Sequence, residues 1–541
     1  MVDYDLIFNN CIIADVINLR FISGDVAVKD GIICAVGGSL GKGIDCGGAY
    51  LLPSFIDAHT HIESSLLTPV RFAEAVLPCG VTTVIADPHE IANVCGMAGI
   101  DYMIEQAART PLDVKMMMPS CVPASDAESS GAILNAADVS AAMARADIFG
   151  LGEMMNYPAV LSGDREVIAK IDAARLEGKA VDGHYPLGSG DALISYAAAG
   201  ITSDHESVDA LEAIEKLRAG IDVFIREGSA GKQLEAVLPA AEGEYFGRVS
   251  LCTDDCNVSD ILKCGHINRV VARAIALGME PIRAIAMATI NPARHYALSD
   301  RGAIAAGRRA DIVLIRDINE MRPYAVYKDG VIVARDGIAL CKTTLESCAA
   351  VLDTVKMPPL TADKLRFSSA AADIGIAINA GSLITDAVSS ELCDNKLCVC
   401  ERHSGSGRVG VCGLSGYGVK GGAVALSVSH DAHNIVCAGD NDTDMCVAVN
   451  ALIASGGGMC AVRGGKVERI LALPIAGLMS DMPPKTVAQE LDSLNDFCRS
   501  KLHINPNLEP VMSLSFLALS VIPHIKLTDR GLFDVDKFKH M

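Results

Sequence analysis

The sequence predicts an α/β fold: a (β/α)8 TIM-like barrel with a small β-sandwich built from both flanks and an additional C-terminal α/β domain. Three observations lead to this prediction. The 541 residues far exceed the ~150 of a typical domain, and 50% of them are hydrophobic, enough for a large core. Short apolar runs alternate with helical stretches through the middle of the chain. Strand-like alternation dominates on either side of that region.

The two flanks of the middle region have the pattern of small sheets. Residues 4–50 contain short apolar runs broken by Gly and Asn, and residues 301–340 repeat this pattern. We therefore expect residues 1–50 and 298–345 to form one composite β-sandwich domain, with the middle region inserted between its halves.

The middle region, residues 51–297, has the size and alternation of a (β/α)8 barrel. A doubly wound open sheet would carry a Gly-rich phosphate loop after its first strand. Here the first strand instead ends in Asp57-Ala58-His59-Thr60-His61, which favours the barrel. The expected strands are 51–56, 82–86, 114–118, 148–151, 179–182, 201–203, 223–225 and 249–253, and the expected helices include 69–77, 97–108, 164–177, 208–217 and 267–277.

The composition changes beyond residue 345. Residues 345–368 contain Pro358 and Pro359 and are expected to connect two domains. From residue 370 to residue 541, alternating strand patterns mix with helical ones, which predicts a further α/β domain. Its expected strands are 396–400, 423–429 and 434–438, and its expected helices are 443–454 and 485–497.

Charge and composition exclude several classes of partner. The 46 basic and 66 acidic residues leave a net charge of −20, which repels phosphate backbones and anionic lipids. No apolar run reaches the ~18–20 residues of a membrane span. The first residues lack the pattern of a secretory signal, and the nineteen cysteines show no CxxC pairing. We expect a cytoplasmic protein that binds neither nucleic acid nor membranes.

Histidines and carboxylates follow the predicted barrel strands. His59 and His61 are two residues apart, so on a strand both imidazoles face the same side. Because a barrel carries its active site at the carboxyl ends of its strands, we expect the other polar residues at these ends to meet them. These residues are Glu153, His184, His205 and Asp254.

This set of side chains predicts a metal site with two ions. Four imidazoles and two carboxylates are too many for one catalytic zinc, which usually has three protein ligands and a water. They are the right number for two divalent ions that share a bridging carboxylate and a bridging hydroxide. Nitrogen and oxygen ligands without thiolate suit Fe²⁺, Mn²⁺ or Zn²⁺, and the residues alone do not rank these metals.

Several segments make the chain resemble a known family over essentially its whole length. The histidine pair and GRRADIVL are shared by many amidohydrolases. More specific segments resemble adenine deaminase of the amidohydrolase superfamily. These segments are DPHEIANV, GLGEMMNYP, DGHYP, ITSDHES, IREGSAGK and CTDD in the barrel, and SHDAHNI, GGGM and LPIAGLMS in the last domain.

The resemblance implies a ligand set, a metal and a reaction. It implies that His59, His61 and Asp254 hold one metal, that His184 and His205 hold the second, and that Glu153 bridges them. Mn²⁺ or Fe²⁺ is the implied metal, with Zn²⁺ as a further candidate. The implied reaction is the hydrolysis of adenine to hypoxanthine and ammonia, a purine-salvage step that uses a hydroxide held between two metals.

Further residues are candidates for proton transfer and substrate binding. Asp254 is expected to take the proton of the attacking hydroxide. Asp87, His89 and Glu90 follow the second strand and are predicted to relay protons, to contact the purine or to form an extra metal position, with orientation of the ligands as the alternative. Three residues after the seventh strand are predicted to bind the purine edge, with a structural ion pair as the alternative: Arg226, Glu227 and Ser229.

Two smaller groups keep open roles. Glu206 and Asp255 adjoin predicted ligands and are expected to support them. In the last domain, the polar cluster of His430, Asp431 and His433 could contribute to the active site, or could form a capped loop or a subunit contact.

Two other functions compete with adenine deamination. A cyclic amidase of the dihydroorotase or hydantoinase type would use the same barrel, but such relatives usually carry lysine where Glu153 stands and lack the last domain. A non-catalytic scaffold on the same fold is the second alternative, and the presence of all six predicted ligands argues against it. We expect the partners to be a small-molecule substrate, adenine, and a second copy of the chain in a homodimer.

Overall fold

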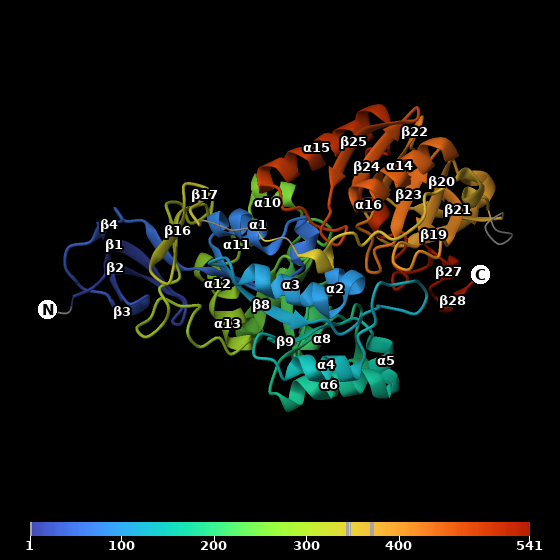
Figure 1. Ribbon diagram of the computed structural model, residues 1–541. Coiled ribbons are helices and arrows are strands. Elements are labelled where there is room, and N and C mark those ends of the chain that lie inside the picture. Colours follow the sequence, from blue (N-terminus) through green and yellow to red (C-terminus); the bar gives the residue numbers. More distant parts are fainter. Residues whose placement is uncertain (1–2, 342–345, 347, 368–372) are drawn as a thin grey trace.

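Strands from before and after the middle region pair in one nine-stranded sheet, at the left of Figure 1. The computed structural model describes residues 3–341, 346, 348–367 and 373–541. Residues 342–345 and 370–372 of the predicted domains lie outside this described part. The strands of the sheet are β1 (Leu6–Asp15), β2 (Arg20–Lys29), β3 (Ile32–Val36), β4 (Ile44–Asp45), β5 (Tyr50–Pro53), β14 (Ile312–Ile315), β15 (Pro323–Lys328), β16 (Val331–Arg335) and β17 (Ile338–Ala339).

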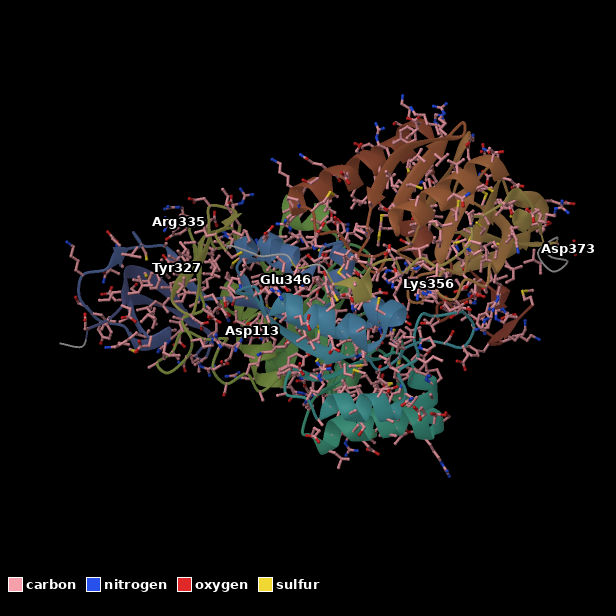
Figure 2. The ribbon with its side chains drawn as sticks, viewed as in Figure 1. Asp113, Tyr327, Arg335, Glu346, Lys356 and Asp373 are labelled. Carbon is pink, nitrogen blue, oxygen red and sulfur yellow. The ribbon has the colours of Figure 1, made fainter. Side chains whose placement is uncertain are left out.

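The two halves of this sheet meet where β5 pairs with β14. Leu51 lies opposite Leu314 in an antiparallel register. The ring edge of Phe8 packs on Tyr327, with ring centroids 5.0 Å apart, so the apolar face also joins both halves. Tyr327 and Arg335 mark this sheet in Figure 2, and Asp113 lies on the edge of the barrel nearest to it.

The middle region contains eight parallel strands in two sheets, which hydrogen bonds join into a ring. At one junction the Thr202 amide donates to the Val181 carbonyl over 2.8 Å. At the other junction the Asp254 amide donates to the His59 carbonyl over 3.0 Å. The strands are β6 (Phe55–Thr60), β7 (Val81–Ala86), β8 (Asp113–Met118), β9 (Gly150–Met154), β10 (Val181–Gly183), β11 (Ser203–Asp204), β12 (Asp222–Arg226) and β13 (Val249–Cys252).

Helices surround these strands, and the α/β class predicted from the sequence is confirmed. The helices are α1 (Pro69–Val76), α2 (His89–Cys95), α3 (Met97–Ala107), α4 (Ala136–Met143), α5 (Tyr157–Ser162), α6 (Arg165–Leu176), α7 (Gly190–Ala198), α8 (Ala210–Arg218), α9 (Leu234–Val237), α10 (Val258–Cys264), α11 (Ile267–Ala276), α12 (Pro281–Met287) and α13 (Ile290–His295). In the described part of the chain, no helix combines the length and the apolar character that crossing a bilayer requires.

One expected strand differs from the structure. The apolar run 51–56 divides at Ser54: β5 joins the nine-stranded sheet, and β6 begins the barrel. Pro53 has no amide to donate, and the Ser54 amide turns to the Asp311 carbonyl over 3.0 Å. The barrel strand β6 thus starts and ends later than the expected range 51–56. As a result, His59 lies within β6 and His61 directly follows it.

The last part of the chain contains an eight-stranded sheet, orange to red in Figure 1, beside the barrel. Its strand order is β19-β18-β21-β20-β23-β22-β24-β25. The elements of this part are β18 (Ile374–Ile378), β19 (Thr385–Ser389), β20 (Asn395–Cys400), β21 (Val409–Ser415), β22 (Gly422–Leu426), β23 (Ile435–Gly439), α14 (Asp442–Ser455), β24 (Gly458–Arg463), β25 (Lys466–Ala472), α15 (Pro484–Lys501), α16 (Met512–Ser515), β26 (Ile525–Thr528), β27 (Gly531–Asp534) and β28 (Lys539–His540).

Polar contacts attach this C-terminal part to the barrel. Asp529 accepts hydrogen bonds from the amide and the hydroxyl of Ser129 over 2.9 and 2.8 Å. The Ser259 hydroxyl donates to Asp492 over 2.6 Å. The loop of residues 427–434, which joins β22 to β23, reaches the barrel just beyond the carboxyl end of β7, where His430 and His433 contact Glu90. Its position brings side chains of the last domain to the predicted active site.

Candidate metal centre

The two histidines at the end of β6 turn their Nε2 atoms toward each other. These atoms lie 3.2 Å apart, and both side chains are buried. The Nδ1 atom of His61 lies 2.9 Å from the Asp87 carbonyl, to which it donates. This bond assigns the proton of the neutral ring to Nδ1 and leaves Nε2 free to bind a metal.

Glu153, from β9, lies between two pairs of histidines. Its Oε1 atom is 3.2 Å from Nε2 of His61 and 3.9 Å from Nε2 of His59. Its Oε2 atom is 3.2 Å from Nε2 of His205 and 2.5 Å from Nδ1 of His184. One carboxylate oxygen therefore faces each pair, which is the arrangement that a bridging ligand requires.

Asp254 directly follows the end of β13 and completes the group. Its Oδ1 atom lies 3.1 Å from Nε2 of His61 and 3.7 Å from Nε2 of His59. Its other oxygen accepts a hydrogen bond from Arg226 over 2.8 Å. The backbone of Asp254 is left-handed, with φ of 57°, and its amide is bonded to the His59 carbonyl. The closure of the barrel thus positions this carboxylate.

These side chains form overlapping groups that could hold metal ions. Within each group the ligand atoms lie within 4.8 Å of one another. Imidazole nitrogens and carboxylate oxygens without thiolate fit Fe²⁺, Mn²⁺ or Zn²⁺. Among the groups are His59, His61 and Asp254; His59, Glu153 and His205; His184, His205 and Glu206; and His61, His89 and Glu153.

The carboxylates and His59 have protonation states that suit metal binding, whereas Glu153 and neighbouring carboxylates raise the pKa of His61, His184 and His205, so a metal would displace protons from these three imidazoles. Burial and the imidazoles of His205 and His61 hold the pKa of His59 well below its usual value, so His59 is neutral. Burial raises the pKa of Asp254, but the hydrogen bond from His61 and the charge of Arg226 outweigh it and hold this pKa well below its usual value. Neutral imidazoles and ionised carboxylates are the protonation states that bind divalent metals.

Asp87 supports the bridging position. Its Oδ2 atom accepts a hydrogen bond from the Glu153 amide over 2.8 Å. A Cβ at Gly152 would lie 2.1 Å from this oxygen, so only glycine permits the approach. The Ser120 hydroxyl donates to the Glu153 carbonyl over 2.5 Å. The backbone that carries Glu153 is therefore held from two sides.

His89 and Glu90, at the start of α2, lie beside this centre. The Nδ1 atom of His89 is 3.4 Å from Oε1 of Glu153. The carboxylate of Glu90 points the other way and contacts His430 and His433 from the loop of residues 427–434. The last domain thus supplies buried side chains at the mouth of the barrel. This position favours the first interpretation of the cluster of His430, Asp431 and His433, a contribution to the active site.

The three predicted purine-binding residues divide between two places. Arg226 lies at the centre, where it donates to Asp254 and, over 3.0 Å, to Glu206. Glu227 contacts Arg273 and accepts a hydrogen bond from the Leu234 amide over 3.2 Å, away from the histidines.

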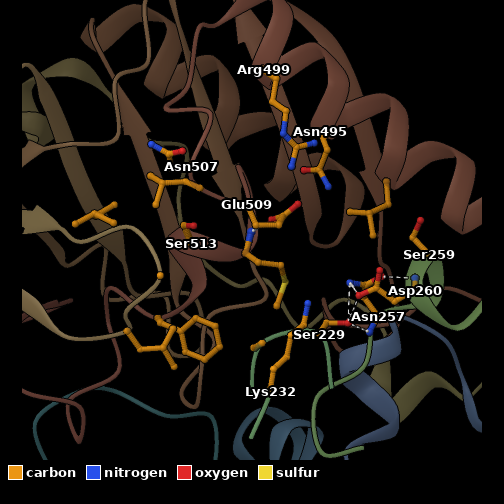
Figure 3. A pocket seen from close by; sticks show the side chains of 18 of the residues that line it. Ser229, Lys232, Asn257, Ser259, Asp260, Asn495, Arg499, Asn507, Glu509 and Ser513 are labelled. Atoms are coloured by element: carbon orange, nitrogen blue, oxygen red, sulfur yellow. Dashed lines mark hydrogen bonds between the residues drawn. The ribbon is translucent and has the colours of Figure 1, made fainter. Parts of the chain in front are cut away.

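Ser229 lies in a neighbouring cavity, where its hydroxyl donates to Asp260 over 2.6 Å. This cavity, of about 760 Å³, separates the barrel loops from the C-terminal domain. Figure 3 shows Ser229, Lys232 and Asn257 on the barrel side, and Asn495 and Arg499 on α15 opposite them.

Phe516 also lines this cavity. Its ring stacks on His430, with centroids 4.7 Å apart and an interplanar angle of 13°. The cavity thus adjoins the barrel-mouth loop.

Glu206 has a larger part in the centre than its predicted supporting role. Its Oε1 atom lies 3.8 Å from Nδ1 of His184 and 3.7 Å from Nε2 of His205. The feature of the sequence that pointed to Glu206 was its position next to His205. Asp255 has a supporting contact, because Ser64 donates to its carboxylate over 2.5 Å.

The chain matches two family models and many named proteins. Residues 50–333 match the amidohydrolase family, and residues 373–539 match the adenine deaminase C-terminal domain. The adenine deaminase of Nitratidesulfovibrio vulgaris strain Hildenborough is 44% identical, over 99% of this chain and 95% of its own length. Adenine deaminase 2 of Desulfotalea psychrophila is 43% identical, over 99% and 96%.

The family model covers more than half of this chain, and these relatives match nearly all of it. The protein is therefore a member of the amidohydrolase family, and within that family it belongs to the adenine deaminases. The cyclic amidase alternative is not favoured, since these relatives have the last domain as well as the barrel.

Proposed function

We propose that this enzyme hydrolyses the bond between adenine and its exocyclic amine, releasing hypoxanthine and ammonia, at a centre that holds two divalent cations. The observation that carries the proposal is the position of Glu153, with one oxygen toward His59 and His61 and the other toward His184 and His205. The full-length similarity to adenine deaminases supports adenine as the substrate.

Each residue of the centre has a proposed role in holding the metals. His59, His61 and Asp254 would hold one cation, His184 and His205 the second, and Glu153 both. Mn²⁺ and Fe²⁺ are the proposed metals, and Zn²⁺ fits the same donors. Two such cations would lower the pKa of water at the centre toward neutrality, which supplies hydroxide at working pH.

Asp254 is the proposed acceptor of the hydroxide proton. Arg226 occupies its Oδ2 atom, while Oδ1 faces the histidines. The carboxylate is ionised, because its pKa is held well below the usual value. An ionised carboxylate beside the reacting atoms can take a proton and pass it toward a ring nitrogen or the departing amine.

His89 and Glu90 are proposed to relay protons or contact the purine. The support is their burial, the position of His89 beside Glu153, and the ion pair with His430 and the hydrogen bond with His433 that fix Glu90 from the last domain. Purine contacts by Arg226, Glu227 and Ser229 remain predictions, and Arg226 is the one whose guanidinium reaches the centre. A homodimer and a cytoplasmic location also remain predictions from the sequence.

The decisive experiment combines metal analysis with an adenine assay on protein produced in Mn²⁺ and in Fe²⁺. We expect two or more metal equivalents per chain, loss of the adenine ultraviolet band and release of ammonia. Asp254→Asn should reduce turnover by orders of magnitude while part of the metal remains bound. The control is Asp172→Asn, whose side chain is 52% exposed.

Three results would contradict the proposal. Near-normal turnover of Asp254→Asn would remove this residue from the chemistry. Hydrolysis of dihydroorotate but not of adenine would identify a cyclic amidase. Less than one metal equivalent per chain, without activity, would indicate a scaffold.

A further inference from the structure

A second group of histidines and carboxylates lies where α2 of the barrel meets the loop of residues 427–434. His89 and Glu90 come from the barrel, and His430, Asp431 and His433 come from the last domain. All five residues are at most 4% exposed. None of them belongs to the six residues proposed above to hold two cations.

Three ligand atoms of this group are spaced as around a metal ion. Nε2 of His89 lies 3.6 Å from Oε1 of Glu90 and 3.9 Å from Oδ1 of Asp431. The three atoms lie within 4.8 Å of one another. Ligands with bonds of ~2.1 Å in a tetrahedral site are about 3.4 Å apart, so small side-chain movements suffice to bring all three into contact with one cation.

The orientation of His89 separates this group from the first centre. Its Nδ1 atom faces Glu153, at 3.4 Å, while its Nε2 atom faces Glu90 and Asp431. Because the two nitrogens point in opposite directions along the ring, a cation at Nε2 would be distinct from those held by Glu153.

Within the described residues, four side-chain atoms of the group lack a hydrogen-bond partner: Oδ2 of Asp431, Nε2 of His430, Nδ1 of His89 and Oε1 of Glu90. Two of them face charged neighbours, since Nδ1 of His89 faces Glu153 and Oε1 of Glu90 faces Nδ1 of His430. Burying a carboxylate without full compensation is costly, and buried charges are usually paired or bound to metal. Oδ2 of Asp431 is thus a buried carboxylate oxygen without a donor, beside Oδ1, which faces His89, and this points to a ligand in addition to the geometry.

We propose that His89, Glu90 and Asp431 hold a third divalent transition-metal cation at the junction of the barrel and the C-terminal domain. One nitrogen and two carboxylate oxygens suit Mn²⁺, Fe²⁺ or Zn²⁺. Such an ion would link α2 to the loop of residues 427–434. It therefore adds a structural connection between the two domains beside the site of the reaction.

The competing account needs no metal. His430 and His433 both contact the carboxylate of Glu90, and protonated imidazoles would neutralise it. Under that account, Asp431→Asn would remove no metal. The two accounts therefore differ in the number of metal ions bound by each variant, a readout independent of deaminase activity.

The test measures metal per chain by mass spectrometry after growth in Mn²⁺ and dialysis against metal-free buffer. We expect three equivalents in the native enzyme and two in Asp431→Asn. The control is Asp536→Asn, which makes the same change at a side chain that is 52% exposed and should retain three. His89→Gln removes another proposed ligand and should also reduce the metal bound per chain by one equivalent. This variant replaces Asp431→Asn in the test if Asp431→Asn does not fold.

The count separates this proposal from the two-cation centre on which it builds. Two equivalents in the native enzyme and in every variant would overturn the third site and leave the first centre intact. Fewer than two in the native enzyme would overturn both. The added stability offers a second readout: Mn²⁺ should raise the unfolding temperature of the native enzyme more than that of Asp431→Asn. Equal increases would contradict the proposal.

Discussion

The carboxylate of Glu90, at the start of α2, is hydrogen-bonded to the imidazole of His433, which lies 343 residues later in the chain. Both side chains are buried, at 2% and 1% exposure. The pair therefore joins the wall of the barrel to the C-terminal domain beside the candidate metal centre. This contact brings the last domain to the edge of the candidate metal centre.

His433→Ala should lower kcat/KM for adenine by roughly 10–100-fold, the usual effect of losing a partner that orients a site. The reason is that Oε2 of Glu90 loses its buried hydrogen-bond donor while His430 still faces Oε1, and an unsatisfied buried acceptor costs about 1–3 kcal/mol. His433→Gln, which keeps a donor, should recover part of the activity.

Steady-state kinetics and thermal unfolding check this prediction, with His524→Ala as the control because that side chain is 54% exposed. Equal activity of His433→Ala and the native enzyme would show that the last domain does not position Glu90.

Glu153→Gln should abolish most of the activity, with kcat/KM reduced by about 10³-fold or more, equivalent to ~4 kcal/mol. An amide has one oxygen and no charge, so it cannot serve both pairs of histidines. At least one metal equivalent should be lost together with the activity. Glu177→Gln, at an exposed position, should change neither quantity. Full metal content in Glu153→Gln would rule out a bridging role.

Gly152→Ala should impair the enzyme although it adds only one methyl group. A Cβ at this position would lie 2.1 Å from Oδ2 of Asp87, so Asp87 must move away from the Glu153 amide. We expect kcat to fall by about tenfold or more, because the backbone that carries Glu153, the proposed bridging ligand, shifts. The matched control is Gly247→Ala, where no atom lies within 4 Å of the added Cβ. Similar kinetics for both variants would contradict this explanation.

Lys526→Met should stabilise the protein in a pH-dependent way. Burial lowers the pKa of Lys526 from 10.5 to about 7. Between these two values the unfolded chain binds the proton and the folded chain does not, so the stability of the native protein rises with pH across this window. The advantage of Lys526→Met should therefore be greatest at pH 7 and below, and should disappear near pH 10.5.

Denaturant unfolding at several pH values measures this difference. Lys466→Met, at a side chain that is 76% exposed, is the control and should show no such trend. A constant difference between Lys526→Met and the native protein would show that Lys526 keeps its proton when folded.

Local patterns in the sequence were sufficient for the class of the fold and for choosing the side chains that the structure brings together in the candidate metal centre. His59, Glu153, His184, His205 and Asp254 each follow or end a predicted strand, and parallel strands place their carboxyl ends at one rim. The division of the run 51–56 between two sheets was not predicted. It depends on the pairing of Leu51 with Leu314, which lies far away in the chain.

The sequence by itself determined which side chains gather at the barrel rim, because strand periodicity and strand ends are local properties of the chain. Only the tertiary structure decided how they face one another: which oxygen of Glu153 serves which histidines, and that Arg226 holds Asp254. It also decided that His433 meets Glu90. Such contacts depend on the packing of separate domains, and nothing in the residues near His433 specifies the surface on which its loop lies.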